Sequence, residues 1–223
     1  MTTLTIATAC WGEPYAQFIP RFWQGVASLN KKPDEIILGI EQDDIAGFAS
    51  SIPDGYNTKI HVFESEDFQK RWSEVMMLAT SNWLIGIAVD DELLPGAFDE
   101  LDQADEQGAD IYVDSIIVRQ SGQRAVGAWD TSNLAHKMPC PGGPATKNDL
   151  FKQIGFKTEF RWIDWIFLID AVKLGAKPYI SKTTRIIYDD GQDRNTWSSV
   201  SMDGTKRQAY CDEVTAYARS LGF

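Results

Sequence analysis

Cysteine and histidine are scarce in this chain of 223 residues. It has three cysteines, none in a CxxC spacing, and two histidines. An odd and widely spaced set of cysteines disfavours a disulfide framework or a zinc site. The shortage of histidine also disfavours hydrolase chemistry of the Ser/His or Cys/His type. Carboxylates must therefore carry most of any acid–base or metal chemistry.

Long apolar runs are also absent. No stretch reaches the roughly 18 apolar residues that a membrane-spanning helix requires. The first residues, MTTLTIATACWGEP, lack the basic region and the long apolar region of a signal peptide. We therefore expect a protein without a membrane span that resides in the cytoplasm.

Positive charge is in short supply. The net charge is −11, and no run of lysine or arginine occurs. An acidic surface repels phosphate backbones unless a local basic patch compensates. This charge disfavours nucleic acid as a partner, although a small basic groove could still accommodate one.

Strand and helix patterns alternate through the first hundred residues. Apolar side chains make up 43% of the chain, enough for a sizeable core, and the length suits a single α/β domain over residues 1–223. Strands are predicted at 3–9, 35–40, 59–63 and 83–89, and helices with Pro20 in the first turn, over 66–80 and from Pro95. This alternation predicts a mainly parallel, doubly wound sheet with flanking helices.

The second half is less regular. A long loop rich in glycine, serine, asparagine and proline is predicted over 119–145. Strands are expected at 110–118 and 177–187, and helices at 147–154, 162–174 and 207–221. The sequence shows no clear boundary between domains.

Acidic clusters follow two of the apolar strands. Asp90, Asp91 and Glu92 come directly after 83–89, and Glu41, Asp43 and Asp44 come directly after 35–40. Ligands of parallel sheets bind beyond the carboxyl ends of the strands, and clustered carboxylates suit Mg²⁺ or Mn²⁺. The first cluster could hold a metal–diphosphate, or could simply favour a helix N-terminus. The second could meet a nucleotide base or ribose, or could form a polar turn.

Asp164 lies among apolar neighbours in the segment RWIDWIF. Removal from water raises the pKa of a carboxyl group, which suits a general base. The alternative is that Asp164 interacts only with the N-terminus of its own helix.

Four segments together resemble family 2 glycosyltransferases, in the order that the family has them. They are TIATACWGEP, IILGIEQDD, WLIGIAVDDELLPGAFDEL and FKQIGFKTEFRWIDWIFLIDAVKLGAK, and the resemblance as a whole covers roughly residues 3–190. The third resembles the metal-binding acidic segment of the family, and the fourth resembles the segment that carries its catalytic Asp.

The resemblance implies a GT-A fold and an inverting, metal-dependent transfer of a sugar from a nucleotide-diphosphate donor to an acceptor hydroxyl. Residues 1–100 would form the nucleotide-sugar half and 101–223 the acceptor-side half. The implied catalytic base is Asp164, and the cofactor is Mn²⁺ or Mg²⁺. The implied metal ligand is Asp90, and the implied donor-binding residues are Thr8, Ala9, Glu41, Asp43, Asp44 and Asp91. Gly142 and Gly143 match the glycines before the acceptor-side helix.

Three departures from the family pattern count against the implied transferase activity. Ala88 and Ile163 replace carboxylates, and Tyr188-Asp189-Asp190 stands where the family often has Arg-x-His. Asp189 or Asp190 could supply a metal ligand there, and Arg194 could meet a phosphate. The departures leave a non-catalytic module that binds a nucleotide-sugar or glycan as one alternative. A nucleotidyltransferase is another, although the first strand lacks the usual Gly-rich loop and basic residue.

The acceptor is not identified by the sequence. Aromatic faces stack on sugars and bases, and Trp11, Trp129 and Trp162 lie at or near the expected edges of the site. We expect these tryptophans on the acceptor side, with a glycan or another hydroxyl compound as the acceptor.

Overall fold

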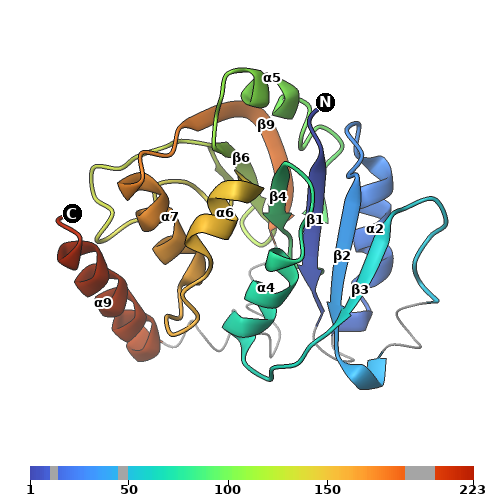
Figure 1. Ribbon diagram of the computed structural model, residues 1–223, viewed down its shortest axis with the longest axis horizontal. Coiled ribbons are helices and arrows are strands. Elements are labelled where there is room, and N and C mark those ends of the chain that lie inside the picture. Colours follow the sequence, from blue (N-terminus) through green and yellow to red (C-terminus); the bar gives the residue numbers. More distant parts are fainter. Residues whose placement is uncertain (11–14, 45–49, 189–203) are drawn as a thin grey trace.

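A single curled sheet with helices on both faces forms the centre of the molecule (Figure 1). The computed structural model describes residues 1–10, 15–44, 50–188 and 204–223. The nine-stranded sheet has the order β3-β2-β1-β4-β8-β6-β9-β5, and β7 pairs with β6. The N-terminal strands form one half of this sheet, and the later strands form the other.

The N-terminal half is parallel, as its apolar strand pattern predicts. Its strands are β1 (Leu4–Ala9), β2 (Glu35–Ile40), β3 (Thr58–Val62) and β4 (Trp83–Gly86). β1 pairs with both β2 and β4, and every residue of β1 and β2 is buried. The ends of β1, β2 and β4 therefore meet at one edge of the sheet, where the acidic clusters follow.

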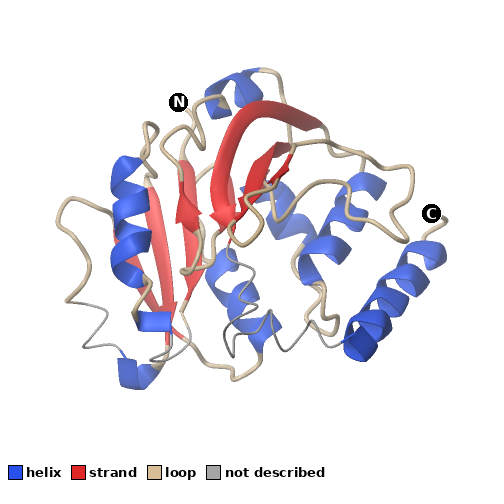
Figure 2. Cartoon of the chain, turned by 180° about the vertical axis from the view of Figure 1, so that it is seen from behind, coloured by secondary structure: helices blue, strands red, loops and turns tan. Residues whose placement is uncertain are grey.

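The second half makes the sheet mixed and gives it its curl. β8 (Ala145–Lys147) runs antiparallel between β4 and β6 (Ile111–Val118), and β9 (Pro178–Tyr188) runs parallel to β6. The far end of β9 pairs with β5 (Glu92–Leu93), and β7 (Arg124–Ala125) borders β6. Figure 2 shows β9 as a long strand that arches over the sheet. The architecture is thus a mixed α/β fold with a mainly parallel sheet.

Helices cover the two faces unequally. One face packs on α2 (Ile19–Ser28) and α5 (Leu101–Glu106), whose apolar side chains join a core around Leu4, Ile6 and Trp83. The other face carries α4 (Phe68–Met77), α6 (Asn148–Ile154) and α7 (Ile163–Lys173). The C-terminal α9 (Gly204–Ser220) packs on α7 at the outside (Figure 1).

The predicted elements differ from the structure mainly between residues 83 and 101. The helix expected from Pro95 is wrong in its start, because residues 95–100 form turns and α5 begins at Leu101. The strand expected to reach residue 89 ends at Gly86, and residues 92–93 instead pair with β9. Leu94 also donates its amide to the carbonyl of Arg185. A partner distant in the sequence therefore decides the backbone here. The predicted 119–145 loop likewise includes β7 and the first residue of β8.

Candidate functional site

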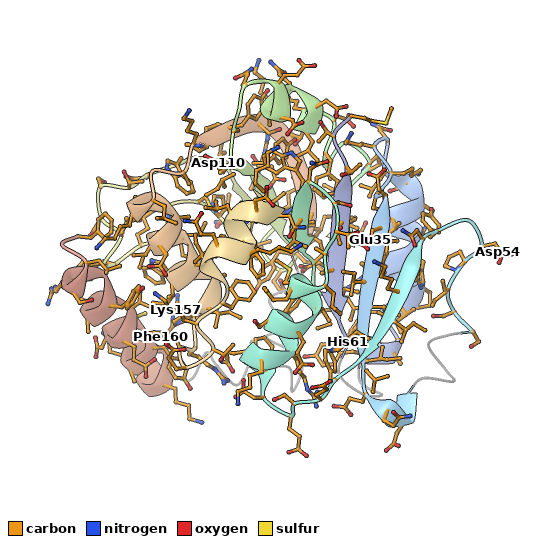
Figure 3. All side chains as sticks on the ribbon, viewed as in Figure 1. Glu35, Asp54, His61, Asp110, Lys157 and Phe160 are labelled. Carbon is orange, nitrogen blue, oxygen red and sulfur yellow. The ribbon has the colours of Figure 1, made fainter. Side chains whose placement is uncertain are left out.

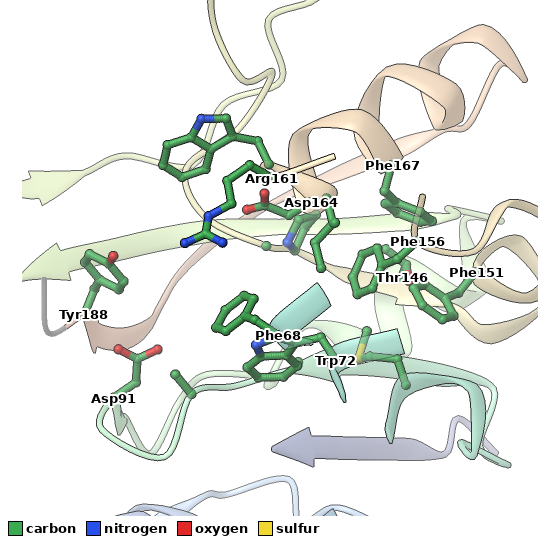
Figure 4. A pocket seen from close by; sticks show the side chains of 17 residues that line it. Phe68, Trp72, Asp91, Thr146, Phe151, Phe156, Arg161, Asp164, Phe167 and Tyr188 are labelled. Atoms are coloured by element: carbon green, nitrogen blue, oxygen red, sulfur yellow. The ribbon is translucent and has the colours of Figure 1, made fainter. Parts of the chain in front are cut away.

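A pocket of about 290 Å³ opens beside the carboxyl ends of the parallel strands. Segments far apart in the sequence line it: α4, the end of β4 and the residues after it, the 143–146 segment, α6, and the start of α7. Figure 4 shows two carboxylates and an arginine at one end and a group of aromatic rings at the other. The pocket is therefore polar at one end and apolar at the other.

Asp91 brings the first acidic cluster into this pocket. Its side chain lines the wall and the residue is 5% exposed. Asp90 is 8% exposed and does not line the pocket, and its carbonyl accepts a hydrogen bond from the Arg21 guanidinium. The two neighbouring aspartates thus have different surroundings, and Asp91 is the one that a ligand in the pocket would meet.

Asp164 lies in the same pocket, on the first turn of α7. Its Oδ1 accepts a hydrogen bond from the Trp165 amide at 2.9 Å. Burial raises the pKa of the Asp164 carboxyl above its usual range, against the lowering effect of that hydrogen bond. A carboxylate held in this way is more basic than one in water.

Arg161 lines the pocket close to Asp164, three residues earlier in the chain, and sequence reasoning missed it. Burial lowers the pKa of its guanidinium, and its Cζ lies 5.4 Å from the centroid of the Tyr210 ring. A guanidinium in such a pocket can bind a phosphate or a carboxylate through paired hydrogen bonds. The sequence feature that could have indicated Arg161 is the order Arg-Trp-Ile-Asp at the start of α7.

The carboxylates of the described residues do not form a complete metal-binding cluster. Nowhere in residues 1–10, 15–44, 50–188 and 204–223 do three or more His, Cys, Asp or Glu side chains form a group that could hold a metal ion. Mg²⁺ and similar ions, however, are often held by one or two carboxylates together with phosphate oxygens of a substrate. Asp91 fits that mode, since it presents a carboxylate to the pocket from the segment between β4 and β5. The predicted ligands Asp189 and Asp190 lie outside the described residues, as does Arg194.

The second acidic cluster lies at the end of β2, outside the pocket. Glu41 accepts a hydrogen bond from Arg71 at 2.6 Å, and Arg71 also lies over the ring of Phe63. Asp43 is exposed, and Asp44 ends the short 3₁₀ helix Gln42–Asp44. The sequence predicted Arg71 only as part of a helix. Its pairing with Glu41 joins α4 to the residue after β2, which are far apart in the sequence.

The predicted residues of β1 are fully enclosed by the sheet. Thr8 is 0% exposed and Ala9 is 1% exposed, next to Leu38 and Gly39 of β2. The Thr8 hydroxyl has no hydrogen-bond partner among the described residues. Thr8 and Ala9 are therefore enclosed within the sheet at the end of β1, and neither lines the pocket.

The predicted acceptor-side residues divide into three groups. Trp162 and Gly143 line the pocket, and the Trp162 indole N–H has no partner among the described residues. Gly142 adopts a positive φ of 64° at the turn before them, and Trp129 packs against the core next to α7. Trp11 lies outside the described residues. Phe68 and Trp72 of α4 also line this pocket, and Trp72 packs against the core as well.

A buried ion pair between β6 and β9 was not predicted from the sequence either. Asp114 of β6 and Arg185 of β9 are each 1% exposed, and Arg185 Nη1 lies 3.6 Å from Asp114 Oδ1. Burial raises the pKa of Asp114 to about 7 even though Arg185 opposes the shift. The signal in the sequence was an Asp within the apolar run IYVDSIIV and an Arg within TTRIIY.

Among the described residues no helix is both long enough and apolar enough to cross a bilayer.

Comparisons with known proteins identify the fold. The sequence matches no protein-family model and no curated protein. The structure is similar to S. aureus TarS 1-349 in complex with UDP-GlcNAc, with a TM-score of 0.68 and 13% identity over 100% of this chain and 73% of that chain. It is also similar to the mannosyltransferase PcManGT from Pyrobaculum calidifontis in complex with GDP-Man and Mn²⁺, with a TM-score of 0.64 and 14% identity over 99% of this chain and 65% of that chain.

A longer TarS structure gives the same result, with a TM-score of 0.67 and 13% identity, but this chain spans only 44% of its length. At these identities the likeness concerns the fold alone. This chain therefore shares the fold of these glycosyltransferases over its whole length.

Proposed function

We propose that this chain is an inverting GT-A glycosyltransferase that takes its sugar from a nucleotide-diphosphate donor. One observation carries the proposal: Asp91 and Asp164, from separate segments, line the same pocket. The fold shared with a UDP-GlcNAc complex and a GDP-Man complex supports it. The resemblance to family 2 glycosyltransferases assigns these two positions to the donor and to the base.

The proposed reaction is a single displacement. The acceptor hydroxyl oxygen forms a bond to the anomeric carbon while the bond from that carbon to the diphosphate oxygen breaks. Asp164 takes the hydroxyl proton, and its raised pKa makes it a stronger base for this step. The nucleoside diphosphate leaves on the opposite face, so the anomeric configuration inverts.

The polar end of the pocket would receive the diphosphate. Arg161 lines this wall and can neutralise phosphate charge through hydrogen bonds. Asp91, with Asp90 beside it, would hold a divalent cation together with the phosphate oxygens. When bound, such a cation would neutralise the leaving diphosphate.

Donor binding is the first test. The purified protein is titrated by calorimetry with UDP-, GDP-, dTDP- and CDP-sugars, with and without Mn²⁺. We expect one nucleotide class to bind in a Mn²⁺-dependent manner and Asp91→Asn to weaken it about ten-fold or more, as for the loss of a charged contact. The control is Asp54→Asn, which makes the same charge change at an exposed residue on the outer edge of the molecule (Figure 3). Failure of every nucleotide-sugar to bind would contradict the proposed transferase function.

A binding module without transferase activity is the second candidate. Ala88 and Ile163 both line the pocket at positions where the family has carboxylates. Their apolar side chains remove two charges that an active transferase of this family would have. Donor binding without transfer or donor hydrolysis would favour this candidate over the first.

A further inference from the structure

Helix α2 packs directly against the acidic segment at residues 90–95. Gly25, within this helix, is the point of closest approach, because a Cβ there would lie 3.0 Å from the Leu93 Cβ and 3.1 Å from the Leu93 amide nitrogen. Just past the helix end, the Asn30 amide donates a hydrogen bond to the Pro95 carbonyl at 2.8 Å. The helix therefore touches the backbone of this segment and not only its side chains.

Strand β9 holds the same segment from a second side. Glu92 pairs with Ile187 and Leu93 pairs with Ile186 in the antiparallel ladder between β5 and β9. The Glu92 carboxylate also forms an ion pair with Arg119 at 2.7 Å. The residues after Asp91 are thus fixed between α2 and β9, so the direction of the Asp91 side chain depends on the turn that precedes them.

A tight turn brings the chain from β4 to Asp91. The Asp91 amide donates a hydrogen bond to the Ala88 carbonyl at 3.1 Å, which closes the turn. The Arg21 guanidinium of α2 donates a hydrogen bond to the Asp90 carbonyl. Both hydrogen bonds fall on one peptide group, because the Asp90 carbonyl and the Asp91 amide belong to the same planar unit. Arg21 and Ala88 therefore hold the two sides of the peptide that precedes the Asp91 side chain.

Arg21 acts on this peptide from outside the pocket wall that the described residues form. Its Cζ lies 5.1 Å from the centroid of the Phe18 ring, next to the start of α2. A guanidinium over an aromatic face gains a cation–π attraction that favours this position of the side chain. The contact with Phe18 thus helps to keep the Arg21 guanidinium in place beside the Asp90 carbonyl.

We propose that Arg21 is a positioning residue of the pocket, which keeps the Asp91 carboxylate turned into the pocket by holding the Asp90 carbonyl. Asp91 lines the pocket and Asp90 does not. A rotation of the peptide between them would turn the Asp91 carboxylate away from a bound ligand, and a binding site requires its side chains to be held in place by their supports. The ligand of Asp91 rests on the proposed function, whereas the support of this peptide by Arg21 does not.

The first test follows amide hydrogen exchange by mass spectrometry in wild type, Arg21→Met and Arg21→Lys. Methionine cannot donate a hydrogen bond, whereas lysine keeps the charge and a donor. We expect residues 87–93 to exchange about ten-fold faster in Arg21→Met, as for the loss of one hydrogen bond to a charged group, while the buried strand β2 exchanges as in the wild type. Arg21→Lys should retain most of the protection. Equal exchange in the two variants would contradict the role of this hydrogen bond.

The second test measures the affinity for a nucleotide-sugar by calorimetry in the presence of Mn²⁺. Arg21→Met should weaken binding about ten-fold, as the loss of a group that orients a metal ligand does. The matched control is Lys32→Met. It removes the same charge and also a hydrogen bond to a backbone carbonyl, but that carbonyl belongs to Ala27 within α2. The control should match the wild type in both the exchange of residues 87–93 and the affinity.

Unchanged exchange of residues 87–93 in Arg21→Met would overturn the proposal. Equally faster exchange in β2 would also overturn it, because Arg21 would then stabilise only the fold as a whole. Full nucleotide-sugar affinity in a variant whose acidic segment exchanges faster would have the same consequence. If Arg21→Met loosened the segment and the wild type bound no nucleotide-sugar, the positioning of Asp91 would stand and the transferase function would be wrong.

Discussion

At the scale of single residues, the environment of a carboxyl group decides what it can do. Asp164 lies at the wall of the pocket, where burial raises its pKa. Glu35 is even less exposed, at 2%, yet its pKa falls to about 2. Burial raises the pKa of Glu35, but hydrogen bonds from Lys59, Thr5 and Thr80 outweigh it. Glu35 is thus fixed as a charged structural group, whereas Asp164 is available as a base.

Replacement of Asp164 tests its role as a base. Asp164→Asn keeps the shape of the side chain but cannot accept the proton, so turnover should fall about 100-fold or more, with donor affinity little changed. The measurement is sugar transfer together with donor calorimetry. Asp149→Asn, at an exposed position on α6, is the control. An Asp164→Asn variant with full turnover would contradict the assignment.

The Asp114–Arg185 pair makes stability depend on pH. In the unfolded chain Asp114 titrates near pH 4, whereas in the folded protein burial raises its pKa to about 7. Between these values the folded state holds a proton that the unfolded state has released. The contribution of Asp114 to stability is therefore present below pH 4 and is lost as the pH rises to about 7.

Asp114→Asn removes this titration. From pH 4 to pH 7 the wild type should lose unfolding free energy relative to Asp114→Asn. Above pH 7 the difference between the two proteins should stay constant. Denaturant unfolding at a series of pH values measures it. Parallel pH curves for the two proteins would show that Asp114 does not titrate in this range.

At the scale of elements, direct contact between backbone and side chains fixes how α4 lies on the sheet. Gly39 of β2 is the point of closest approach. A Cβ there would lie 2.5 Å from Val75 Cγ1 and 2.6 Å from Phe63 Cε1. Only a residue without a side chain lets α4 and the Phe63 ring pack against β2 at this distance.

Gly39→Ala should therefore destabilise the fold by about 1–3 kcal/mol through overpacking. The midpoint of urea unfolding measures the effect. Because Val75 is the nearest neighbour, the double variant with Val75→Ala should recover part of the loss, as coupled residues do. An unchanged midpoint in Gly39→Ala would contradict the close approach.

At the scale of the whole molecule, the C-terminal helix supports the side of the pocket that carries Arg161. Tyr217 of α9 donates a hydrogen bond to Asp170 of α7 at 2.6 Å, and Lys157 forms an ion pair with Asp170 at 2.7 Å. Figure 3 shows Lys157 and Phe160 beside α9. The helix α9, the helix α7 and the segment before α7 are thus tied together around the Asp170 carboxylate.

Tyr217→Phe tests this support. It removes the hydrogen bond that the hydroxyl donates to Asp170 and the one that it accepts from Lys157, but keeps the ring that packs on Phe160 at 5.2 Å between centroids. Stability should fall by about 1 kcal/mol, as measured by thermal unfolding. Tyr210→Phe, on the same helix, keeps the ring that lies under Arg161 and is the control. Equal losses in both variants would show that the Asp170 hydrogen bond contributes nothing specific.

The sequence by itself determined the local elements and the edge of the sheet where chemistry is placed. Apolar runs predicted β1 and β2, and their spacing with the helices predicted a doubly wound sheet. The acidic residues after β2 and β4 indicated the carboxyl edge. Such features depend on neighbouring residues, because strand alternation and helical periodicity are local properties of the chain.

Only the tertiary structure decided which of these residues share a pocket. It turned Asp91 rather than Asp90 toward Asp164, and paired Glu41 with Arg71 and Asp114 with Arg185. It also placed Phe68 and Trp72 of α4 in the pocket wall, although Trp72 packs against the core at the same time. The spacing of apolar residues along a helix is the same whether that face packs against another element or lines a cavity. The difference arises from how distant segments pack, which no local pattern encodes.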